Sequence, residues 1–138
     1  MEKLHIMYRM YGGDKPEIRP DFYSKELCLR SIMVALKAAS NWTFTLYYDG
    51  TAPLALVAML KDFGGRVVNL GGLGNSEAFR VVYEKALDKS KDDWVYFVED
   101  DYLHKPNAII GLLEAIILNK FEYGNYLKSI MEAKLDAV

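Results

Sequence analysis

The feature that most constrains this chain is a run of large apolar or aromatic residues that ends in three carboxylates. Residues 94–98 are Trp-Val-Tyr-Phe-Val, with no polar alternation. Such a run is typical of a strand buried on both faces in the middle of a parallel sheet. Glu99, Asp100 and Asp101 follow directly. We therefore predict a central strand whose carboxyl end carries three acids.

Three adjacent carboxylates disfavour one another's ionisation, so the cluster should hold a proton or recruit a counter-charge. Hard carboxylate oxygens suit Mg²⁺ or Mn²⁺. The carboxyl ends of parallel strands are also where open α/β sheets bind ligands. The alternative is a solvated turn in which Asp101 caps the next helix. The pattern alone leaves both interpretations open.

The rest of the chain alternates strand and helix patterns. Apolar and β-branched runs predict strands at 4–8, 42–48 and 66–70. Helical spacing predicts helices at 25–39, after a Ser24 cap, and at 54–63, 77–89 and 108–118. Right-handed crossovers would make this an α/β fold, a mainly parallel Rossmann-like sheet with helices on both faces. We expect one domain over 1–118, with 119–138 as its helical C-terminal extension.

Composition narrows the function classes. The chain has 138 residues, with 17 Lys and Arg against 19 Asp and Glu, and no basic stripe that would favour nucleic acid. Cys28 is the single cysteine, which excludes an internal disulfide and a CxxC zinc site. The first residues lack a signal-peptide pattern, and no apolar run approaches the ~20 residues of a membrane span. We expect a cytoplasmic protein without a transmembrane segment.

Two of the predicted strands are followed by polar residues that could reach a ligand. Arg9 ends the first strand, and Lys15 and Arg19 lie in the Gly- and Pro-rich loop after it, where cations contact phosphate or simply solvate the loop. Asp49 ends the second strand, where an acid can accept a hydrogen bond from a base or ribose. Asp49 and Gly50 are equally a standard turn pair.

A glycine-rich turn precedes the third helix. Gly72-Leu73-Gly74 leads into Asn75, and the free amides of a helix N-terminus favour an anion there. The dinucleotide fingerprint is incomplete, because Glu77 stands where the third glycine belongs. Arg80 lies one turn into the helix, facing the same edge or the solvent. His104, after the three acids, is a candidate ligand or proton carrier, or an ordinary turn residue.

Together, several short segments resemble the family-2-like glycosyltransferases of GT-A fold, over about residues 4–117. The segments are Tyr8-Arg9-Met10-Tyr11, Tyr23-Ser24-Lys25, Tyr48-Asp49-Gly50, Gly72-Leu73-Gly74-Asn75-Ser76 and the stretch from Tyr96 to His104. The metal motif of that family, Asp-any-Asp in general form, also occurs as Glu-Asp-Asp. The resemblance implies a GT-A fold.

The resemblance also implies roles for individual residues. Asp49 would contact the nucleotide base, Glu99 and Asp100 the ribose side, and Asp101 the Mn²⁺ or Mg²⁺ ion on the diphosphate. Arg9, Asn75 and Arg80 would add nucleotide contacts. The implied activity is transfer of a sugar from a nucleotide-sugar, with a UDP-sugar as the expected donor, to an unknown acceptor.

The chain departs from the family after the acidic motif. Complete GT-A enzymes continue with strands that form the acceptor side and, in inverting members, supply a catalytic base. No buried strand is predicted after Leu118, and none of Glu114, Glu122, Glu132 and Asp136 can be assigned as that base.

Four alternatives therefore stay open. They are a nucleotide- and metal-binding module without transfer activity, a subunit whose acceptor half comes from another chain, another Mg²⁺-dependent enzyme such as a nucleotidyltransferase, and an α/β domain with a solvated acidic turn. Apolar surface left by an absent half would also favour a homo-oligomer.

Overall fold

The computed structural model describes residues 2–12 and 19–118. Its elements, in chain order, are β1 (Leu4–Tyr11), α1 (Lys25–Leu36), β2 (Trp42–Asp49), α2 (Leu54–Phe63), β3 (Arg66–Asn69), α3 (Asn75–Leu87) and β4 (Trp94–Glu99), and residues 108–118 form a further helix. The predicted extension at 119–138 and the loop residue Lys15 lie outside the described residues.

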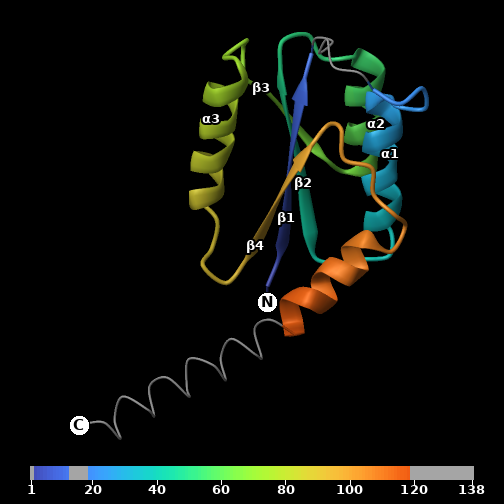
Figure 1. The fold of residues 1–138 in the computed structure, drawn as a ribbon. Helices are drawn as coiled ribbons and strands as arrows, with labels where there is room; N and C mark the ends of the chain where they lie inside the picture. Colours follow the sequence, from blue (N-terminus) through green and yellow to red (C-terminus); the bar gives the residue numbers. More distant parts are fainter. Residues whose placement is uncertain (1, 13–18, 119–138) are drawn as a thin grey trace, which may run out of the picture.

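The strands form one parallel sheet in the order β3-β2-β1-β4. Helices α1 and α2 cover one face of this sheet and α3 covers the other (Figure 1). The predicted α/β fold with a mainly parallel sheet is therefore confirmed. The chain places β2 and β3 on one side of β1 and then returns to place β4 on the other. The strand order thus reverses between β1 and β4.

Strand β1 is the centre of the core. Its alternate residues Leu4, Ile6, Tyr8 and Met10 are buried in the cluster that α1 and α2 cover. On the opposite face, Met7 packs with other buried side chains, Tyr47 of β2 and Val82 of α3. Burial on both faces is the mark of a central parallel strand.

The prediction that residues 94–98 form a central strand is wrong for the described sheet. Strand β4 stands at the end of the strand order, and Trp94 is 36% exposed. The run is apolar throughout because both faces of β4 still meet apolar groups. Val98 lies in the cluster under α1, whereas the Phe97 ring lies 6.1 Å from Phe79 of α3. An edge strand packed on both faces has the same sequence pattern as a central one.

Local signals set two of the helix ends. The Ser24 hydroxyl accepts a hydrogen bond from the Leu27 amide at 3.0 Å, which is the predicted N-cap. Helix α2 ends at Gly64 in the left-handed conformation, with φ 104°. Strand β1 runs two residues beyond Arg9, the predicted end, because Met10 and Tyr11 pair in register with Tyr48 and Asp49 of β2. Arg9 is therefore a strand residue.

His104 has a structural position. Its Nε2 lies 2.8 Å from the Tyr96 hydroxyl, and its amide donates to the Ser31 hydroxyl of α1 at 2.9 Å. These bonds fasten the segment after β4 to the sheet and to α1. Burial lowers the pKa of His104 below its ordinary value.

Gly12→Ala should destabilise the fold. A Cβ at residue 12 would lie 2.3 Å from the Thr51 nitrogen, because the chain ends of β1 and β2 approach closely there. We expect a loss of about 1–3 kcal/mol in the free energy of unfolding, measured by urea denaturation. The control is Gly111→Ala in the last helix, where nothing lies within 4 Å and a gain of about 0.5–1 kcal/mol is expected. Equal effects of the two substitutions would contradict the close approach.

His104 should make stability depend on pH. Because its pKa is lowered in the folded protein, the unfolded chain binds the proton more tightly. The stabilising effect of the neutral imidazole is complete above the unfolded pKa of about 6.5 and is lost as pH falls below it. We expect the free energy of unfolding to fall less between pH 7 and pH 5 in His104→Gln than in the unsubstituted protein. Identical pH profiles in urea denaturation would refute this.

Candidate functional site

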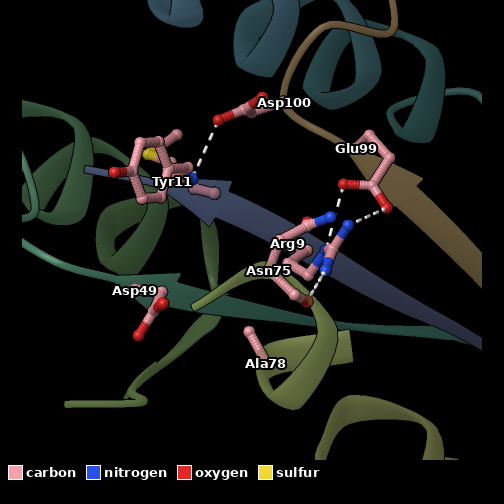
Figure 2. Close-up of a pocket in the computed structure, with 8 residues that line it drawn as sticks. Arg9, Tyr11, Asp49, Asn75, Ala78, Glu99 and Asp100 are labelled. Atoms are coloured by element: carbon pink, nitrogen blue, oxygen red, sulfur yellow. Dashed lines mark hydrogen bonds and ion pairs between the residues drawn. The ribbon is translucent and has the colours of Figure 1, made fainter. Parts of the chain in front are cut away.

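The carboxyl ends of β1, β2 and β4 meet at one edge of the sheet and enclose a small cleft (Figure 2). Its lining residues are Arg9, Met10, Tyr11, Asp49, Asn75, Ala78, Glu99 and Asp100. The structure thus brings together five of the residues predicted from sequence. The cleft volume is about 20 Å³, room for about one water molecule. In this conformation the cleft is closed.

Arg9 closes the cleft. Its Nε and one terminal nitrogen donate to the two carboxylate oxygens of Glu99 at 3.1 and 2.9 Å, and its other terminal nitrogen donates to the Asn75 carbonyl at 2.8 Å. Figure 2 shows the guanidinium between these partners. Its central carbon also lies 5.4 Å from the centre of the Phe79 ring. Arg9 therefore joins β1 to β4 and to the start of α3.

Asp100 is directed toward α1. It is 6% exposed, accepts a hydrogen bond from the Tyr11 amide at 2.9 Å and lies 3.6 Å from the Lys25 ammonium. Lys25 also donates to the Tyr11 carbonyl. Lys25 was not among the residues predicted for the site. Its position in the first turn of α1 could have indicated such a role, because helices that follow parallel strands begin at the edge of the sheet where ligands bind.

Asp101 pairs with the segment before α1. Arg19 donates to its carboxylate at 2.9 Å and lies 4.9 Å from the centre of the Tyr23 ring. Each of the three consecutive acids thus faces a cation from a different part of the chain. The counter-charge expected from the sequence is supplied by the protein itself.

Asp49 holds the glycine-rich turn. It is 4% exposed, and its two oxygens accept hydrogen bonds from the amides of Leu73 and Gly74 at 2.7 and 2.8 Å. Gly74 has φ 87°, a conformation that favours glycine. The anion predicted at the start of α3 is therefore, in this structure, the side chain of Asp49.

Arg80 lies apart from the cleft lining. Its side chain is 55% exposed and pairs along α3 with Glu77 at 2.8 Å and Glu84 at 2.6 Å. These spacings of three and four residues are ordinary on the surface of a helix. The structure therefore does not bring Arg80 together with the predicted site residues.

A larger cavity lies beside Asp101 and was not predicted. Its volume is about 210 Å³. Its lining residues are Arg19, Pro20, Phe22, Tyr23, Leu27, Cys28, Asp101 and Leu103. They come from two separate segments, residues 19–28 and 101–103, and no local sequence pattern marks such a combination.

The donor chemistry limits how a metal could bind. Across residues 2–12 and 19–118, no three or more His, Cys, Asp or Glu side chains are arranged to hold an ion. Mg²⁺ usually takes one or two carboxylates and completes its shell with water and substrate phosphates. An ion at these carboxylates would therefore need ligands beyond the described side chains.

The comparisons with known proteins do not assign the site. No protein-family model matches the chain, and no curated protein matches it significantly. In the part of the chain that the structure describes, no helix is long and apolar enough to cross a membrane.

Asp49→Asn should loosen the glycine-rich turn. An amide side chain has one acceptor oxygen, so one of the two backbone N–H groups would lose its partner. We expect a loss of about 1–3 kcal/mol and faster hydrogen exchange at the Leu73 and Gly74 amides. The control is Asp62→Asn, at an exposed position of α2. Unchanged exchange at both amides would show that Asp49 does not hold the turn.

Proposed function

We propose that this protein is a metal-dependent glycosyltransferase of GT-A type that takes its sugar from a nucleotide-sugar, with a UDP-sugar as the expected donor. One observation carries the proposal. Three consecutive carboxylates stand at the end of β4 beside β1, where the strand order reverses. Open α/β sheets bind their ligands in the crevice at that point.

Different residues would contact different parts of the donor. Asp101 would hold the Mn²⁺ or Mg²⁺ ion, and Glu99 and Asp100 would accept hydrogen bonds from the ribose. Each oxygen of Asp49 accepts one backbone hydrogen bond and has capacity for another, which a base N–H group could use. Arg9 and Asn75 line the same cleft and would add nucleotide contacts.

Donor binding requires Arg9 to leave Glu99, because the closed cleft holds about one water molecule. A guanidinium binds a phosphate in the same two-pronged way as a carboxylate. Arg9 would therefore exchange one anionic partner for another, and Glu99 would become free for the ribose. The Arg9 and Glu99 pair would thus keep the cleft narrow until a donor binds.

Sugar transfer releases a nucleoside diphosphate. A divalent ion bound beside Asp101 would neutralise the negative charge that develops on this leaving group. Asp100 is held by the Tyr11 amide and by Lys25, so the backbone next to Asp101 is already fixed before the donor arrives. The described residues supply no assigned base for the acceptor hydroxyl.

The second candidate is a binding module without transfer activity. Such a module could also be a subunit whose acceptor half comes from another chain. The described residues supply no assigned base for an acceptor hydroxyl, which favours this candidate, since a regulatory or carrier site needs only to bind the nucleotide. Exposed aromatic residues, including Phe79, Tyr83 and Trp94, would support association with a second copy. A cytoplasmic location stays a prediction.

The substitution Asp101→Asn distinguishes a metal-dependent donor site from an acidic turn that binds no metal. Titration calorimetry with UDP, GDP and their common sugar conjugates, with Mn²⁺ present, should show binding that excess chelator abolishes. We expect the substitution to weaken this binding at least about tenfold, a loss of about 1.4 kcal/mol. Asp62→Asn, exposed on α2, is the matched control and should bind normally.

Two results would contradict the proposal. One is the absence of binding by every nucleotide and conjugate tested. The other is binding that neither chelator nor Asp101→Asn alters. Binding without slow hydrolysis of any sugar conjugate would favour the second candidate.

A further inference from the structure

The cavity beside Asp101 lies on the α1 side of the sheet, apart from the cleft that Arg9 closes. It shares none of its lining residues with that cleft. Its volume of about 210 Å³ is below the roughly 300–1,000 Å³ of pockets for drug-sized ligands. The cavity is therefore suited to a ligand of about one ring.

The walls of this cavity are mostly apolar, with one polar side. Phe22 is 66% exposed and available to a ligand, and the ring of Tyr23 and the side chain of Leu27 also line it. The polar side is the ion pair of Arg19 with Asp101, at 2.9 Å. The aromatic side chains can pack against the C–H face of a sugar-like ring. The Arg19 guanidinium can donate hydrogen bonds to hydroxyl groups of such a ring, and the Asp101 carboxylate can accept them.

The charges around the cavity disfavour an anion. Asp100 and Asp101 are balanced by Lys25 and Arg19, and the Arg19 guanidinium already binds a carboxylate. A phosphate would have to displace that carboxylate and leave it near the phosphate's own negative charge. A neutral hydroxylated ring needs no such exchange, because its hydroxyls can donate to Asp101 and accept from Arg19.

We propose that this cavity binds one neutral sugar ring, with its C–H face on the aromatic walls and its hydroxyls at Arg19 and Asp101. Binding of the ring stands on the cavity itself. Only its role as the acceptor, next to the donor across Asp101, rests on the proposed function.

The chain's single cysteine provides a probe for this cavity. Cys28 lines the cavity and is 2% exposed, so a ligand that fills the cavity should cover its thiol. The experiment follows alkylation of Cys28 by N-ethylmaleimide, using mass spectrometry, with increasing methyl glycosides of glucose, galactose, mannose and N-acetylglucosamine. No nucleotide or metal is present. We expect at least one glycoside to slow alkylation about threefold or more, with saturation at millimolar concentration.

Variants identify the contacts. Phe22→Ala should weaken the protection by the active glycoside, whereas Tyr83→Ala, an exposed aromatic on α3, should leave it unchanged. Circular dichroism checks that each variant is folded. If the thiol resists the reagent, shifts of the Tyr23, Leu27 and Leu103 amide signals during the same titrations decide the question.

The proposal is overturned if no glycoside slows alkylation or shifts those signals. It is also overturned if protection is equal in Phe22→Ala and Tyr83→Ala, or if UDP, in a separate series without glycoside, protects Cys28 better than every glycoside does. Because the assay contains no donor, a failure here leaves the donor site untouched. Conversely, a failure of UDP and Mn²⁺ to bind would remove the acceptor role and leave ring binding to be judged by Cys28.

Discussion

The charge of three adjacent carboxylates is the constraint on which the carboxyl edge of the sheet depends. Glu99, Asp100 and Asp101 are each paired with a cation, and these cations come from β1, from the first turn of α1 and from the segment before α1. Exposed pairs contribute roughly 0–1 kcal/mol each, but these are partly buried and share neighbouring acids. The pairs therefore fix how three segments of the chain meet.

The same three acids divide the edge into two sides. Arg9 and Glu99 lie toward α3, where the cleft is closed, and Asp101 and Arg19 border the open cavity on the α1 side. A charged donor would need charged surroundings, and a neutral ring would need mostly apolar ones. The lining on the α3 side is rich in charged residues, and the lining on the α1 side is mostly apolar. On the α3 side a cation can change partners, and on the α1 side apolar walls surround one ion pair. Asp101 would lie between the two ligands.

Local signals explain how far the sequence could predict the structure. The Ser24 cap, the Gly64 stop and the alternation of strand and helix patterns depend on neighbours in the chain, and they gave the fold class correctly. The edge position of β4 was missed, because aromatic residues of α3 make an edge strand look central. The pairing of Arg19 with Asp101 spans 82 residues and leaves no local pattern. Asp49 allowed two interpretations, and the amides it binds were not foreseen.

Paramagnetic broadening by Mn²⁺ tests the central claim, that these acids form a metal site completed by a nucleotide diphosphate. Mn²⁺ broadens the NMR signals of amides close to it. With UDP present, we predict selective broadening at Tyr11 and at residues 99–101, reversed by excess Mg²⁺, and much weaker broadening at these amides with Mn²⁺ alone. Broadening centred on the exposed acids Glu77 and Glu84, or no difference with UDP, would contradict the account.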